Sequence, residues 1–295
     1  MIYRVTHQTT YDYSESVSLC QNLAHLAPRK TARQVCRGTT LRIQPEPAIL
    51  YPRTDYFGNS ATFFSVQEPH KQLTVTAHHV AQVEPAGPLP EPAATPPWEA
   101  VRDRLASDRS PETLEAYQFV FDSPYVQAGE ELAAYAAPSF LPGRPLLEGV
   151  LALTRHIHAD FKYDPRATTV ATPLREVLSH RRGVCQDFAH LGIACLRSLG
   201  LAARYVSGYL ATTPAAGKEP LVGADASHAW LSIWCPGPGW IDVDPTNNVV
   251  PDLQHILLAW GRDYDDVSPT KGVILGGGKH TVAVAVQVTR SSDDE

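Results

Sequence analysis

A proline-rich stretch divides the chain into two unlike parts. It runs from Glu84 to Pro97 and reads EPAGPLPEPAATPP. Proline fixes φ and has no backbone N–H, so such a stretch continues neither a helix nor a central strand and instead prefers a stiff, extended form. We therefore expect a connector over residues 85–97 with a separate domain on each side.

The part before the connector, residues 1–84, has the pattern of a β-rich domain. Short runs rich in β-branched and aromatic residues are broken by proline and glycine, and they include residues 2–5, 39–43, 61–66 and 73–77. Several short strands separated by turn signals are typical of an antiparallel β-sandwich. We predict that architecture for the N-terminal domain.

The part after the connector mixes helix and strand signals. Helical spacing recurs around residues 111–120, 129–137 and 146–159, and a strand-rich half begins at residue 203. The alternating run at 282–289 predicts a final buried strand, and residues 291–295 read as a solvated tail. We expect an α+β domain over residues 98–290.

Cys185 lies where a helix is expected to begin. Gly183 interrupts the chain before it, and Gly200 stands where a helix commonly stops. At a helix N-terminus the free backbone N–H groups favour a thiolate, the nucleophilic form of cysteine. Between these limits the apolar positions follow helical spacing, at Phe188, Leu191, Cys195 and Leu199.

His228 begins an alternating segment that reads as a strand, residues 228–234, and residues 240–244 read as its return strand after the turn PGPG. The register of this hairpin decides where Asp244 points. With a four-residue loop, Asp244 faces away from His228. With a three-residue loop, Cys235 pairs with Gly239 and Asp244 becomes the diagonal neighbour of His228 on one face, within reach of a side-chain hydrogen bond. We predict the second register.

Three segments resemble the catalytic blocks of the bacterial transglutaminase-like superfamily, which shares a papain-like core. They are GVCQD at 183–187, SHAW at 227–230 and WIDVDPTN at 240–247, in the order of that family. Residues 3–13 and 55–59 are similar to the β-rich N-terminal domain of bacterial members, and residues 261–267 are similar to a segment that follows their core. The resemblance covers most of the chain.

The resemblance implies a catalytic triad of Cys185, His228 and Asp244. The thiolate attacks an amide carbonyl, the imidazole relays the proton to the leaving amine, and the carboxylate orients the imidazole. A thioester results, which water hydrolyses as in a peptidase or amidase, or which an amine acceptor such as lysine consumes as in a transglutaminase. A different class is a binding or scaffold protein that keeps this fold without turnover.

Further residues are candidates for supporting roles. Tyr163 and Gln186 compete as the second oxyanion donor, next to the backbone N–H of Cys185. Asp242 has the strand parity of Asp244 and is its rival as the orienting acid. Trp230 and Trp240 are expected in the core or the wall of a substrate groove. The cluster Arg262, Asp263 and Tyr264 either lines that groove or locks the last strand to the core by ion pairing.

Composition excludes several other classes. The net charge of −6 and the lack of a basic run argue against a nucleic-acid binder, and no apolar stretch is long enough to cross a membrane. Five cysteines without CxxC spacing and the lack of a leader sequence predict reduced thiols in the cytoplasm. No cofactor or metal is expected, because no acidic loop has ligand spacing. The expected partner is a peptide or protein amide, and the oligomeric state stays open.

Overall fold

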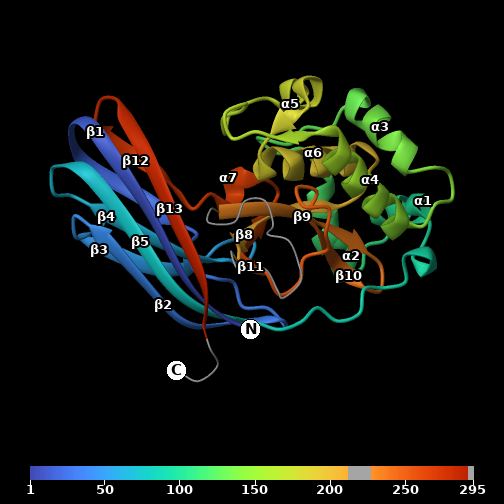
Figure 1. Cartoon of the computed structure of the whole chain (residues 1–295), viewed down its shortest axis with the longest axis horizontal. Coiled ribbons are helices and arrows are strands. Elements are labelled where there is room, and N and C mark those ends of the chain that lie inside the picture. The colour runs from blue at the N-terminus through green and yellow to red at the C-terminus, as the bar shows by residue number, and fades with distance from the viewer. Residues whose placement is uncertain (212–226, 292–295) are drawn as a thin grey trace.

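The computed structural model describes residues 1–211 and 227–291, which form two parts (Figure 1). A large antiparallel sheet, mostly from the N-terminal third, lies beside a group of helices and a smaller sheet. This arrangement confirms the α+β fold class. The end of the tail, residues 292–295, lies outside the described residues.

The larger sheet has seven strands joined through the longest of them. Its strands are β1 (Ile2–Ala24), β2 (Gln34–Gln44), β3 (Ile49–Thr54), β4 (Ser60–Val66), β5 (His70–Val83), β12 (Thr270–Gly276) and β13 (His280–Ser291). The first half of β1 pairs with β5 and β13, and the second half pairs with β4 and β12. Because Phe64 of β4 and Leu73 of β5 share one buried core, the two halves pack together as in a sandwich.

The last two strands belong to this sheet, which corrects the domain boundary expected at residue 290. β12 pairs with residues 17–24 of β1, and β13 pairs with residues 2–13. The expectation of a buried final strand is also wrong, since Val282 and Val284 of β13 are 50% and 55% exposed at the sheet edge. An alternating apolar run specifies a strand but not its partner, so the sequence left this pairing undetermined.

The smaller sheet has four antiparallel strands in the order β10-β9-β8-β11. They are β8 (Ala203–Leu210), β9 (Ser227–Cys235), β10 (Gly239–Val243) and β11 (His255–Gly261). Helix α6 (Cys185–Ser198) packs on this sheet and is buried along nearly its whole length. A Cβ atom on Gly192 would lie 2.5 Å from the side chain of Leu231, so glycine is what lets the helix approach β9 this closely.

Six further helices are present among the described residues. The helical segments predicted around 111–120, 129–137 and 146–159 are confirmed, and two helices that the sequence analysis did not single out, α1 and α5, join them. The helices are α1 (Trp98–Ser107), α2 (Pro111–Tyr117), α3 (Glu130–Ala136), α4 (Leu146–Asp160), α5 (Leu174–His180) and α7 (Tyr264–Val267). A parallel pair of two-residue strands, β6 (Lys162–Tyr163) and β7 (Arg182–Gly183), leads into α6.

The hairpin of β9 and β10 has the predicted register. Gly239 pairs with Cys235 and Val243 pairs with Leu231, so the loop has three residues and Asp244 follows opposite Trp230. Gly239 takes a φ of +81°, a conformation that favours glycine. This register places Asp244 on the same face as His228.

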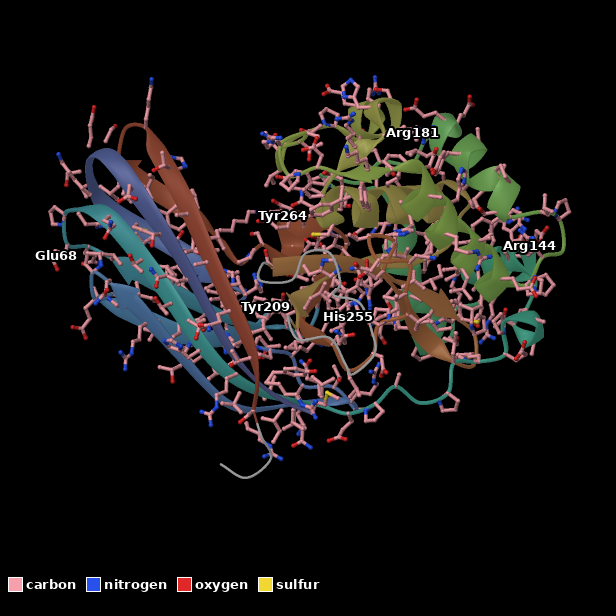
Figure 2. The ribbon with its side chains drawn as sticks, in the orientation of Figure 1. Glu68, Arg144, Arg181, Tyr209, His255 and Tyr264 are labelled. Atoms are coloured by element: carbon pink, nitrogen blue, oxygen red, sulfur yellow. The ribbon has the colours of Figure 1, made fainter. Side chains whose placement is uncertain are left out.

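The two parts meet along β11, the edge strand of the smaller sheet. The side-chain amide of Gln34 bonds both the N–H and the C=O of Leu257, and the amide of Asn59 does the same at Trp260. The hydroxyl of Tyr209, a residue labelled near the boundary in Figure 2, lies 3.0 Å from Nδ1 of His7 in β1. Side-chain amides therefore take the place of a neighbouring strand along this edge.

None of the helices in the described part of the chain is both long enough and apolar enough to cross a bilayer.

We expect Gln34→Ala to destabilise the protein. The change removes the partner of the Leu257 N–H and the amide that bonds the C=O groups of Arg29 and Leu257, and a buried unsatisfied polar group costs about 1–3 kcal/mol. Denaturant unfolding should therefore show a loss of roughly 2–4 kcal/mol. The control is Gln72→Ala, which removes an exposed amide from the same sheet and should change stability little. Equal effects of the two variants would contradict this reading of the edge.

Candidate active site

Cys185 is the first residue of α6, as predicted, and its side chain is buried at 8% exposure. The start of the helix is held by Asp187, whose carboxylate accepts hydrogen bonds from the N–H of Val184 (2.8 Å) and the hydroxyl of Thr168 (2.6 Å). A Cβ atom on Gly183 would lie 2.5 Å from this carboxylate, which explains the glycine at that position. The sequence thus fixes the thiol where free helix N–H groups are available.

His228, the second residue of β9, lies between Asp244 and the thiol. Its Nε2 atom is 2.8 Å from Oδ2 of Asp244. The Cys185 side chain is close enough to the same ring to raise its pKa, and Nδ1 of His228 is a buried nitrogen without a hydrogen-bond partner among the described residues. The structure therefore brings the three predicted side chains together.

Asp244 is fully buried and accepts hydrogen bonds from five donors. Its Oδ2 atom accepts from His228, from Nε2 of His255 (3.1 Å) and from the amide of Asn247 (2.8 Å). Its Oδ1 atom accepts from the backbone N–H groups of Thr246 and Asn247. Such saturation keeps the carboxylate ionised in a site without water access.

The pair of His228 and Asp244 is electrostatically coupled. Burial by itself would lower the pKa of the imidazole, but the charge and hydrogen bond of Asp244, together with Cys185, outweigh it and raise that pKa to about 10. Burial likewise opposes ionisation of Asp244, yet the two histidines hold the pKa of this carboxyl well below its usual range. The arrangement favours an imidazolium beside a carboxylate, the state in which His228 can donate a proton.

His255 is a residue that the sequence analysis missed. It begins β11, and its ring lies edge-on to Trp230 at 5.2 Å while its Nε2 atom bonds Asp244. It comes from outside the three recognisable blocks, so no motif points to it. His255 is a positioning residue, since it acts on the imidazole only through the carboxylate.

The two candidate oxyanion donors lie in different elements, Tyr163 in β6 and Gln186 in the first turn of α6. Tyr163 pairs in β6 with Gly183, two residues before the thiol. Burial raises the pKa of its phenol, and the nearby Cys185 adds to this shift. Gln186 is partly exposed in the first turn, and its side chain has no hydrogen bond within residues 1–211 and 227–291. Which of the two donates to the oxyanion stays a prediction.

Asp242 does not contact His228. Its carboxylate accepts a hydrogen bond from the indole of Trp230 (3.1 Å), so Asp244 alone of the two acids bonds the imidazole. Trp230 is buried and Trp240 half-buried, and both line a cavity on the other face of the smaller sheet from α6. A Cβ atom on Gly208 would lie 2.4 Å from the Trp230 ring, so glycine makes room for the indole.

The cluster Arg262, Asp263 and Tyr264 connects the end of β11 to neighbouring helices. Arg262 forms a two-pronged ion pair with Asp266, and Asp263, fully buried, caps α7 and bonds the N–H of Tyr125. The Tyr264 N–H donates to His190 of α6. These contacts fasten the end of β11 to the helical layer, and a role of the cluster in a substrate groove stays a prediction.

His228, Asp244 and His255 also offer ligand atoms within 4.8 Å of one another, a spacing that suits a metal ion. Here the 2.8 Å contact between His228 and Asp244 is already a hydrogen bond, and Asp244 Oδ2 accepts two more. A cation would have to displace these protons, so the donor set fits hydrogen bonding better than metal binding.

Two family models match the chain. The bacterial transglutaminase-like N-terminal region matches residues 3–82, and the transglutaminase-like superfamily matches residues 134–245, which hold all three side chains of the candidate triad.

Curated relatives match along nearly the whole length. An uncharacterized protein of Mycobacterium tuberculosis is 44% identical over 99% of this chain and 94% of its own, and one of Mycobacterium leprae is 35% identical over 97% and 98%. A protein-glutamine gamma-glutamyltransferase of Pseudomonas aeruginosa is 33% identical over 34% of this chain and 16% of its own. The solved structure of a candidate cysteine protease from Cytophaga hutchinsonii has the same fold, with a TM-score of 0.77 and 22% identity, over 100% of this chain and 92% of that one.

We expect the destabilisation caused by Asp244→Asn to depend on pH. The raised pKa of His228 contributes stability that is fully present below the unfolded value near 6.5 and is lost as pH rises through about 10. The lowered pKa of Asp244 contributes stability above pH 4. Unfolding free energies of wild type and variant should therefore differ more at pH 6 than at pH 10.5, by at least about 1 kcal/mol.

The control for this pH series is Asp103→Asn, which removes an exposed carboxylate paired with Arg102. Its small effect should stay constant over the same range. If the Asp244→Asn difference stayed constant as well, the coupling between carboxylate and imidazole would be refuted.

Proposed function

The chain belongs to the transglutaminase-like superfamily, and from this membership and the site geometry we propose that it is a cysteine-dependent amide acyl-transfer enzyme. One observation carries the proposal. His228 bonds Asp244 through Nε2, and Cys185, at the start of a buried helix, lies close enough to the same imidazole to raise its pKa. A nucleophile, a proton carrier and an orienting acid are the parts that such chemistry needs.

The first half-reaction forms a thioester. The Cys185 thiolate attacks the carbonyl carbon of an amide, and the oxyanion that develops accepts the backbone N–H of Cys185, with Tyr163 as the second donor. When the tetrahedral intermediate collapses, the C–N bond breaks and His228 gives its proton to the leaving amine. Asp244 stabilises the imidazolium before this transfer and holds the ring in place.

The second half-reaction is proposed to be hydrolysis. Water loses a proton to His228 and attacks the thioester, which releases the acid and returns the thiol. The substrate is then a peptide or protein amide and the enzyme a peptidase or amidase. The alternative acceptor is a primary amine, as in a transglutaminase. The partial match to the Pseudomonas aeruginosa transferase supports this alternative. A scaffold without turnover has no physical need for a saturated, buried Asp244 beside an imidazole.

A reducing compartment suits this chemistry, and we propose the cytoplasm. All five cysteines are free, so the nucleophile has no disulfide partner.

We expect Cys185 to react faster than the other cysteines with a thiol-directed electrophile. Limited labelling with iodoacetamide followed by mass spectrometry of peptides measures this for all five thiols at once. His228→Ala and Asp244→Asn should each slow the labelling of Cys185 at least tenfold at pH 7, because they remove the imidazolium or its counter-charge.

Two controls accompany the labelling. Asp242→Asn, which changes a neighbouring acid that bonds Trp230 and not His228, should leave the rate near that of wild type. Cys36, a partly exposed cysteine far from α6 in the sequence, gives the reference rate for an ordinary thiol. Equal rates for Cys36 and Cys185, unaffected by the changes at 228 and 244, would favour the scaffold.

The acyl-enzyme should be observable and its fate measurable. Incubation with a peptide library and rapid acid quench should show a mass increase on Cys185 that is absent in Cys185→Ser. Adding increasing concentrations of a primary amine then partitions the thioester between acid and amide products. If the enzyme is a peptidase, we expect the acid to be the main product at millimolar amine. A predominance of the amide would instead identify a transglutaminase.

A further inference from the structure

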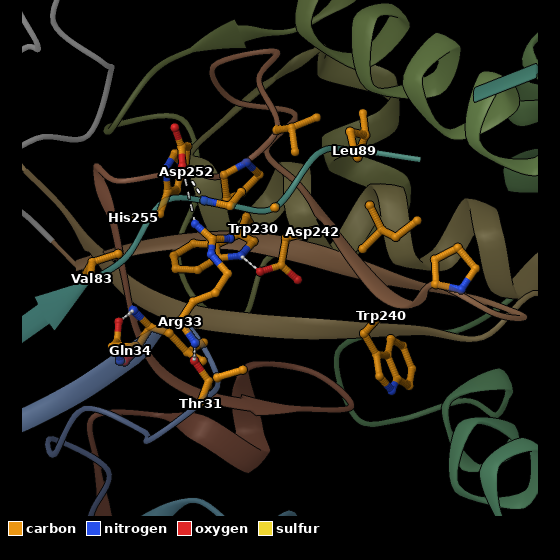
Figure 3. Close-up of a pocket in the computed structure, with 18 of the residues that line it drawn as sticks. Thr31, Arg33, Gln34, Val83, Leu89, Trp230, Trp240, Asp242, Asp252 and His255 are labelled. Atoms are coloured by element: carbon orange, nitrogen blue, oxygen red, sulfur yellow. Dashed lines mark hydrogen bonds and ion pairs between the residues drawn. The ribbon is translucent and has the colours of Figure 1, made fainter. Parts of the chain in front are cut away.

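A cavity of about 770 Å³ lies where the two parts of the protein meet, on the face of the smaller sheet that carries Trp230. The connector between Val83 and Leu89 forms one wall, and Trp230 and Trp240 line others (Figure 3). Its size falls within the range of small-molecule sites. The stretch that the sequence analysis treated as a spacer is therefore part of a built cavity.

Arg204 of β8 lines this cavity and is itself only 7% exposed. Its guanidinium lies between two indole rings, 4.2 Å from the centre of Trp240 and 3.8 Å from that of Trp260. The ring faces attract the charge but accept none of its N–H groups in the way that an oxygen does. Throughout the described part of the chain, the side chain of Arg204 has no hydrogen bond or ion pair, and its Nε atom is a buried donor without a partner.

The other charged side chains of the cavity already have partners. Asp242 accepts from Trp230, Asp252 pairs with Arg33 at 3.4 Å and accepts the N–H of Ala86, and His255 bonds Asp244. Among the described lining residues, Arg204 is thus the charged side chain that has neither a hydrogen bond nor an ion pair. Burial lowers the pKa of Arg204 to about 9 against the attraction of Asp242, as expected for a cation removed from water.

We propose that this cavity binds a carboxylate carried on an apolar body, with Arg204 as the group that receives the carboxylate. A guanidinium matches a carboxylate in a two-pronged geometry, and three tryptophans with Leu257 and Ile241 supply apolar wall for the rest of the ligand. One guanidinium without a hydrogen-bond partner matches one carboxylate. A doubly charged phosphate would meet Asp242 and Asp252 in the same cavity.

The proposal does not depend on the amide chemistry assigned to Cys185. None of the three triad side chains lines the cavity. His255 and Trp230 do line it, and they lie next to Asp244 and His228, respectively. An acylated amino acid and the C-terminus of a longer peptide present the same carboxylate, so the experiment includes both sources.

The test is a titration of full-length Cys185→Ser, which cannot turn the ligands over, with N-acetyl-leucine and with N-acetyl-leucinamide, which differ in the carboxylate alone. Calorimetry and tryptophan fluorescence both report binding, because Trp230, Trp240 and Trp260 line the cavity. We expect saturable binding of the acid and at least tenfold weaker binding of the amide. A third ligand, acetyl-Ala-Ala-Leu, is titrated into Cys185→Ser so that turnover cannot be mistaken for binding.

Arg204→Met keeps an aliphatic stem between the two indoles. It should weaken the binding of N-acetyl-leucine at least tenfold. Arg102→Met, which removes an exposed guanidinium near Trp98, is the matched control and should leave the affinity unchanged. If the Met variant does not fold, Arg204→Lys takes its place, with a charge but no fork, and should bind several-fold more weakly.

Equal affinities for acid and amide, no saturable binding of either, or full binding by the Arg204 variant would overturn the proposal. Binding of the peptide as tightly as of N-acetyl-leucine supports it and assigns a peptide C-terminus as the ligand. Binding of the small acid alone also supports it and assigns a free acylated amino acid.

Discussion

The buried carboxylate of Asp244 is the constraint on which the site depends. An ion withdrawn from water costs several kcal/mol unless its oxygens are satisfied, and here the five donors come from β9, from the turn after β10 and from the start of β11. All three segments must be in register at once for the charge to be tolerated. The same contacts also orient the imidazole of His228. The strand register that lets the sheet bury Asp244 is therefore the register that positions the imidazole.

The N-terminal part of the chain contributes to that condition from outside the sheet. β11 has β8 on one side, and on its other side Gln34 and Asn59 bond its backbone through their side-chain amides. Without them the edge of the sheet would expose unpaired N–H and C=O groups beside His255. The return of β12 and β13 to β1 adds a second covalent tie between the parts. The two regions therefore support each other despite the connector between them.

Local sequence signals predicted the helix that begins at Cys185 and the register of the hairpin. They did not predict which strands or side chains distant in the sequence pair with each other. Gly183 and the spacing after Cys185 marked the helix, and the parity of Asp244 with His228 selected a three-residue loop. Gln34 carries no such signal, because its partner Leu257 lies far away in the chain, and His255 lies outside the recognisable blocks, so no motif pointed to its bond with Asp244. β13 was predicted as a strand but assigned to the wrong sheet, since alternation does not name a neighbour.

Trp230 gives the two faces of the site different chemistry. Its indole fills the space above Gly208, bonds Asp242 and lies against both His228 and His255. On the side of α6, the imidazole meets a thiol at the positive end of a helix, where negative charge is stabilised. On the other side, the same wall closes a cavity whose unpaired charge is the cation Arg204. A bulky side chain at position 208 would displace the Trp230 indole. It would therefore disturb both the surroundings of His228 and the wall of the cavity, so the glycine is needed for both.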